Sequence, residues 1–124
     1  MAKEHWKPEP AEHDFPAAVD YLTLLFRPSD AQAIADLLRK APTVERKAKD
    51  LMRASRLELL PKNDVEVAKD LQKVAGGERL SPVLLVRNPV AAAPLIIADG
   101  YHRICASYHL DEDVLIACRI VDVP

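Results

Sequence analysis

The feature that most constrains this chain is an apolar run that meets a helix-forming run with a single glycine between them. Leu95 to Ala98 has the apolar character of a buried strand, Asp99 and Gly100 follow it, and Tyr101 to Leu110 has the pattern of a helix. Glycine adopts backbone conformations that are closed to other residues, so Gly100 permits a sharp turn. We therefore expect a strand that passes almost directly into a helix at this point.

A junction of this kind favours the binding of an anion. The first amides of a helix have no partners within it, and the helix dipole places partial positive charge there. His102 and Arg103 add side-chain donors: Arg103 through a forked pair of hydrogen bonds, His102 by donating to an oxygen or moving a proton near neutral pH. The alternative is structural, with Asp99 capping the helix, Gly100 forming an ordinary turn and the two basic side chains in solvent.

The run from about Leu57 to Val121 resembles the ParB/sulfiredoxin superfamily. The letters from Asp99 to Arg103 are similar to the D-G-H-H-R and G-x-x-R signatures of that family. The strand expected to open at residues 81–86 and the closing strand at 114–121 also follow the family's order of elements. The resemblance implies an α+β fold, in which a small mixed sheet with helices occupies residues 56–124.

The resemblance also implies a function, namely the binding of a nucleoside triphosphate such as ATP or CTP together with Mg²⁺. The nucleotide-binding residues would be Gly100, Tyr101, His102 and Arg103. Catalytic roles would fall to His102 and Asp99, and Asp99 would also be the metal ligand, because a carboxylate beside a phosphate is repelled unless a cation intervenes. Whether the nucleotide is turned over, by an NTPase or an ATP- or CTP-dependent phosphotransferase, stays open at this point.

Members of the superfamily differ at the motif. Sulfiredoxins use a cysteine where this chain has Tyr101, so sulfinic acid reductase activity is not expected. A free-serine kinase in the family keeps the aspartate, second histidine and arginine, and it relies on an acidic residue after the first strand. Asp64 or Glu66 would fill that place here. ParB proteins, which bind and hydrolyse CTP, carry an arginine-rich version of the loop.

The residues before the motif domain divide into an arm and a helical part. Residues 1–13 contain charges and two prolines and are expected to form a flexible arm. Residues 14–55 are expected to form a helical extension with helices at 14–26, 30–40 and 43–55, making one compact unit with the domain. A second hypothesis follows from this extension, in which the protein is a non-enzymatic interaction module that binds a protein partner or a second copy through these helices.

The remaining elements are expected from local signals. Residues 56–61 form a strand candidate that ends at a proline, and Asn63 is expected to cap a helix over residues 64–74. Residues 82–87 and 95–98 are expected to be strands that pair in antiparallel fashion across the loop at 88–94.

Composition narrows the function classes. The formal net charge of −2 gives no general attraction to nucleic acid, so a third hypothesis of DNA binding or nuclease action is possible but not favoured. No apolar run is long enough for a membrane span and the first residues lack a secretory pattern, so a cytoplasmic protein without membrane contact is expected. Cys105 and Cys118 are expected to be buried apolar residues.

Overall fold

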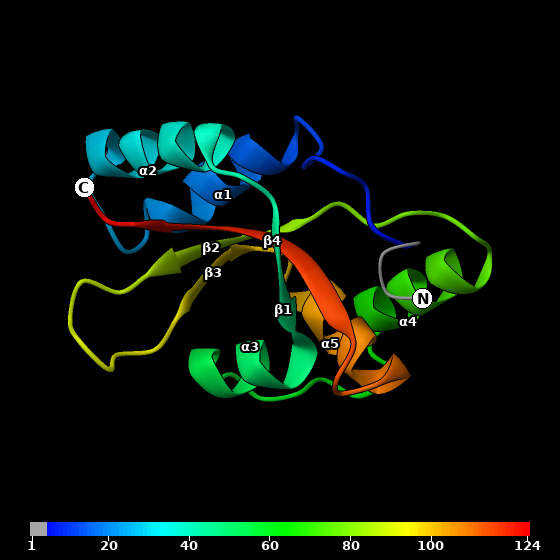
Figure 1. Ribbon diagram of the computed structural model, residues 1–124. Coiled ribbons are helices and arrows are strands. Elements are labelled where there is room, and N and C mark those ends of the chain that lie inside the picture. Colours follow the sequence, from blue (N-terminus) through cyan, green and yellow to red (C-terminus); the bar gives the residue numbers. More distant parts are fainter. Residues whose placement is uncertain (1–4) are drawn as a thin grey trace.

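The structure is a computed structural model that describes residues 5–124, and it has three layers, with helices on both faces of a mixed sheet (Figure 1). This arrangement confirms the expected α+β class. The elements in chain order are α1 (Asp14–Leu22), α2 (Pro28–Lys40), β1 (Val44–Lys47), α3 (Ala48–Ser55), α4 (Val65–Ala75), β2 (Val83–Arg87), β3 (Ile96–Asp99), α5 (Tyr101–Leu110) and β4 (Leu115–Asp122).

The sheet has the strand order β1-β4-β2-β3 and mixes both kinds of pairing. The β2–β3 pair is antiparallel, as predicted, with Leu85 opposite Ile97. β4 lies between β1 and β2, antiparallel to the first and parallel to the second, so that Cys118 stands opposite both Val44 and Val83. The parallel pair is possible because α5 and the chain around it carry the backbone from one end of the sheet to the other.

Each face of the sheet is covered by its own helices, and β2 supplies side chains to both cores. Leu84 and Val86 point into a core formed with α1 and α2, which contains Leu22 and Ile34. The neighbouring residues Val83 and Leu85 point to the opposite face, toward α3, α4 and α5. A strand buried on both faces reads as a continuous apolar run, and this explains the sequence Val-Leu-Leu-Val at this position.

The predicted helix over residues 43–55 is wrong in its first third. Residues 44–47 form β1, which pairs with β4 at the edge of the sheet, and helix α3 begins only at Ala48. None of the four residues of β1 is fully buried, as is usual for an edge strand, and pairing with β4 outweighs the helical propensity of the three charged residues.

The strand predicted at residues 56–61 does not form. Arg56 adopts a left-handed conformation, φ 58°, which ends α3 and turns the chain away. The following backbone is held by side chains of α5 instead of a neighbouring strand. The Tyr101 hydroxyl donates to the carbonyl of Glu58, and a ring nitrogen of His109 lies 2.7 Å from the carbonyl of Leu60.

The segment before α1 is packed against the sheet, in contrast to the expected flexible arm. Trp6 is only 4% exposed, and its indole N–H donates to the carbonyl of Leu115 over 3.2 Å. Backbone hydrogen bonds join His5 and Lys7 to Leu80. Residues 1–4, the rest of the expected arm, lie outside the described part of the chain.

Two element ends also differ from the sequence expectation. Helix α1 ends at Leu22, and a turn replaces the expected last helical turn to Phe26. Helix α4 is capped by Asp64 and not by Asn63, because the Asp64 carboxylate accepts from the amides of Glu66 and Val67.

Within residues 5–124 no helix is both long and apolar enough to cross a membrane.

Candidate functional site

The strand-to-helix junction has the geometry that the sequence predicts. β3 ends at Asp99, α5 begins at Tyr101, and Gly100 between them has φ 107°, a conformation that side chains rarely adopt. A Cβ atom on Gly100 would lie 2.8 Å from the Cβ of buried Val83 and 3.0 Å from an Arg103 nitrogen. Both the backbone conformation and the close packing therefore require glycine here.

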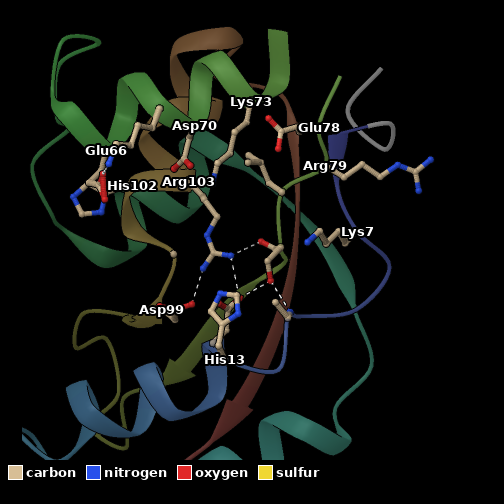
Figure 2. A pocket seen from close by; sticks show the side chains of 16 residues that line it. Lys7, His13, Glu66, Asp70, Lys73, Glu78, Arg79, Asp99, His102 and Arg103 are labelled. Atoms are coloured by element: carbon tan, nitrogen blue, oxygen red, sulfur yellow. Dashed lines mark hydrogen bonds and ion pairs between the residues drawn. The ribbon is translucent and has the colours of Figure 1, made fainter. Parts of the chain in front are cut away.

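A cavity of about 340 Å³ opens at this junction. It lies between α4, the start of α5, the segment before α1 and the stretch that leads into β2 (Figure 2). Its lining carries both signs of charge, from residues that are far apart in sequence: Lys7, Ala11, His13, Asp14, Glu66, Lys69, Asp70, Lys73, Glu78, Arg79, Leu80, Ser81, Asp99, Gly100, His102 and Arg103.

Arg103 is held at the floor of this cavity by groups of the protein itself. Its side chain is 13% exposed, and one terminal nitrogen donates to Asp99 over 2.7 Å. The other terminal nitrogen donates to the carbonyl of Ser81 over 2.7 Å and to Asp14 over 3.2 Å. Asp14 also accepts from the Ser81 hydroxyl. We call Arg103, Asp14, Asp99 and Ser81 the Arg103 cluster. The forked pair of hydrogen bonds expected for a phosphate is therefore directed at protein carboxylates.

Asp99 takes part in this cluster and does not cap the helix. No side chain caps α5, and the Asp99 carboxylate bonds to Arg103 one turn further on. Burial raises the pKa of Asp99, and the nearby Asp14 adds to this, while the Arg103 guanidinium opposes it. The amides at the start of α5 therefore have no capping side chain, and two of them belong to His102 and Arg103, which line the cavity.

The other two predicted site residues face different surroundings. His102 lines the cavity with its side chain 44% exposed, and its Nε2 lies 4.0 Å from the carboxylate of Asp64. Tyr101 does not line the cavity. Its ring packs against the apolar core, and its hydroxyl bonds to the backbone of Glu58. The structure thus brings together Asp99, His102 and Arg103 but turns Tyr101 away.

The two acidic residues that the sequence offered for the place after the first strand, Asp64 and Glu66, have different positions in the structure. Asp64 is the cap of α4, whereas Glu66 lines the cavity from the first turn of the same helix.

Several cavity residues were not anticipated from the sequence. Lys69, Asp70 and Lys73 were not considered, although they share one face of α4 with Glu66 at helical spacing, and that polar stripe was a signal available in the sequence. Lys7 reaches the site from the packed N-terminal segment, which only the fold reveals. Figure 2 shows these side chains around the cavity, with Arg103 at its centre.

Asp70 is the most unusual of these residues. It is 9% exposed and lines the cavity, and its carboxylate accepts no hydrogen bond from the residues that the structure describes. Burial raises the pKa of Asp70, although the charges of Lys73, Arg103 and His102 oppose this effect. The Asp70 side chain extends from α4 toward Arg103 (Figure 2).

This environment makes a prediction about stability and pH. Because the folded state raises the pKa of Asp70, the ionised form destabilises the fold above that pKa, and stability recovers as the pH falls through it. Asp70→Asn should therefore raise the free energy of unfolding at pH 7 by about 1 kcal/mol, the scale of one unpaired buried polar group. Urea titrations at pH 7 and pH 4 should show the gain shrinking at the lower pH. A variant less stable than the wild type at pH 7 would show that Asp70 is satisfied in the fold.

The described residues form no ready-made metal centre. In residues 5–124, no group of three or more histidine, cysteine, aspartate or glutamate side chains is arranged to hold a metal ion. Both cysteines are buried and unpaired, and burial raises the pKa of the Cys118 thiol to about 11, so neither is an evident nucleophile.

Comparisons of the chain with protein-family models, with curated proteins and with solved structures gave no match.

Proposed function

We propose that the cavity at the β3–α5 junction binds the phosphate groups of a nucleoside triphosphate. The observation that carries this proposal is the uncapped start of α5, where Gly100, His102 and Arg103 line a cavity that also receives exposed cationic side chains. Lys7, Lys73 and Arg79 line that cavity and form no ion pair with another described residue. Unpaired amides, the helix dipole and mobile cations together favour a phosphate.

The roles of the motif residues in this proposal follow from their contacts. Gly100 allows the backbone to approach the ligand, and His102, which is half exposed, donates to a phosphate oxygen. Arg103 fixes the turn through Asp99 and contributes its charge from the floor of the cavity. Mg²⁺ would enter with the phosphates, since magnesium commonly binds through one or two carboxylates plus substrate phosphates, and Asp99 is the nearest carboxylate to the junction.

The proposed family is the ParB/sulfiredoxin superfamily. Its support is the glycine junction followed by histidine and arginine, together with a mixed sheet in which a parallel strand pair and an antiparallel pair share β2. Within this proposal the reaction, if there is one, is hydrolysis or transfer of a phosphoryl group.

Calorimetry with and without Mg²⁺ tests the proposal, using ATP, CTP, GTP, ADP and inorganic tripolyphosphate. We expect Lys73→Ala to weaken the binding of a triphosphate about tenfold or more, the scale of one charged hydrogen bond. Lys40→Ala is the matched control, because Lys40 is an exposed lysine at the end of α2 that does not line the cavity. It should leave affinity unchanged.

Two results would contradict this function. The first is the absence of heat with every nucleotide and with tripolyphosphate at concentrations that detect a dissociation constant of about 100 μM. The second is an equal loss of affinity in Lys73→Ala and Lys40→Ala, which would show that only the overall charge matters.

A second candidate function is a protein-interaction module, in which the N-terminal helices bind a second copy. Three large apolar side chains at the end of α1 favour it, because Tyr21, Leu24 and Leu25 are all exposed and Leu24 is 80% exposed. Light scattering should then report a dimer, and Leu24→Asp should convert it to a monomer. A monomer at all concentrations would remove this candidate.

A further inference from the structure

We propose that Asp70 makes the cavity selective for a phosphorylated ligand that carries an O–H or N–H donor only a few bonds from its phosphate. This inference rests on the proposed phosphate site and names the second group that the ligand must present. The donor is a sugar hydroxyl if the ligand is a nucleotide, and an ammonium group if it is a phosphorylated amine.

The first step of the argument is the state of Asp70. Asp70 as a residue is nine-tenths buried, its oxygens remain open to the cavity, and a carboxylate in such a position normally has a hydrogen-bond donor. Two neighbouring carboxylates of the cavity have one, since buried Asp14 and partly buried Asp99 both accept from Arg103. Asp70 alone among these three lacks a donor within the described residues, and it lines the cavity.

The second step concerns which kind of ligand group can bind to Asp70. A phosphate cannot satisfy Asp70, because two anions repel each other. A donor group on the ligand can, and it gains the strength of a hydrogen bond to an ionised acceptor in a partly dry site. The cavity therefore has an anion-binding part at the start of α5 and a donor-binding part at Asp70.

The third step is the separation of the two parts. Asp70 and Lys73 are three residues apart on α4, so their Cβ atoms are about 5–6 Å from each other. Asp70 also lies close enough to Arg103 and His102 for their charges to act on its pKa. Both parts share one cavity of about 340 Å³. A ligand that reaches both therefore has its donor near its phosphate, as in a phosphorylated two-carbon amine or a ribose phosphate.

The test compares ligands that differ only in the donor, on three proteins. Phosphoethanolamine is compared with propyl phosphate, in which a methyl group replaces the ammonium group. ATP is compared with its 2′,3′-dideoxy form, which lacks the ribose hydroxyls. Tripolyphosphate reports on the anion-binding part alone. The proteins are the wild type, Asp70→Asn and the control Glu78→Gln, an exposed acid of the same cavity.

We expect the wild type to prefer the donor-bearing member of one pair by about tenfold, as for a charged hydrogen bond. Asp70→Asn should reduce that preference to about twofold or less, while binding tripolyphosphate at least as tightly as the wild type. Glu78→Gln should keep the preference. The pair that shows it identifies the source of the donor.

Two outcomes overturn the inference, and they can be told apart. If tripolyphosphate binds but neither pair shows a preference, or if Asp70→Asn keeps it, the role of Asp70 is wrong and the phosphate site stands. If tripolyphosphate and every phosphate ester fail to bind, the phosphate site is wrong and this inference falls with it.

Discussion

Replacing Gly100 with valine is expected to lower the free energy of unfolding by about 3–5 kcal/mol and to abolish phosphate binding. Backbone strain and steric overlap both contribute to this loss of stability. A φ of 107° strains any residue with a side chain by about 1–3 kcal/mol. The new side chain would also overlap the fully buried Val83, and overpacking of a core typically costs about 1–3 kcal/mol more. Urea unfolding followed by circular dichroism measures the loss.

The chain offers a control that separates strain from overlap. Gly77 also has a positive φ of 83°, but an added Cβ there would meet nothing within 4 Å. Gly77→Ala should therefore lose only about 1 kcal/mol, the strain alone. In a Val83→Ala background, Gly100→Ala should be less damaging than in the wild type. Equal losses for Gly77→Ala and Gly100→Ala would show that packing against Val83 is unimportant.

Arg103→Ala is expected to lower the free energy of unfolding by about 3–5 kcal/mol, the cost of removing one partner of a buried ion pair. The change leaves Asp14 and Asp99 close together without a cation and frees the carbonyl of Ser81. Because the two carboxylates then lack the Arg103 cation, lowering the pH should restore part of the stability. Thermal and urea unfolding at pH 7 and pH 4 measure both effects.

The matched control is an arginine that pairs at the surface. Arg87 lies 3.2 Å from Asp122, and both side chains are more than half exposed. Arg87→Ala should cost about 1 kcal/mol or less, since exposed ion pairs contribute little. If Arg103→Ala cost no more than this control, the Arg103 cluster would not hold the junction, and Arg103 would be available for a phosphate as the sequence alone suggested.

The junction could be predicted from the sequence because its signals are local. An apolar run, one glycine and a helical pattern lie within a few positions of each other, and Gly100 has the backbone conformation this pattern requires. The surroundings of Arg103 could not be predicted in the same way. Asp14 lies 89 positions away in the sequence, and only the packing of α1 against β3 brings the two together.

The secondary-structure errors have a similar cause. Residues 44–47 are charged enough for an exposed helix face, and only the presence of β4 beside them makes them a strand. Residues 56–61 look like a strand because three leucines stand before a proline, but the carbonyls of Glu58 and Leu60 are bonded by Tyr101 and His109 of α5. In both places a partner distant in sequence decides the local structure.

The position of β4 within the sheet has a consequence for how the chain folds during synthesis. β1 and β2 make no pair with each other, and each is joined to the sheet through β4. A nascent chain that has released residues up to the end of α5 can form only the β2–β3 pair, so the edge of β2 that pairs with β4 stays open. Until residues 115–122 emerge from the ribosome, this segment is exposed to chaperones and to self-association.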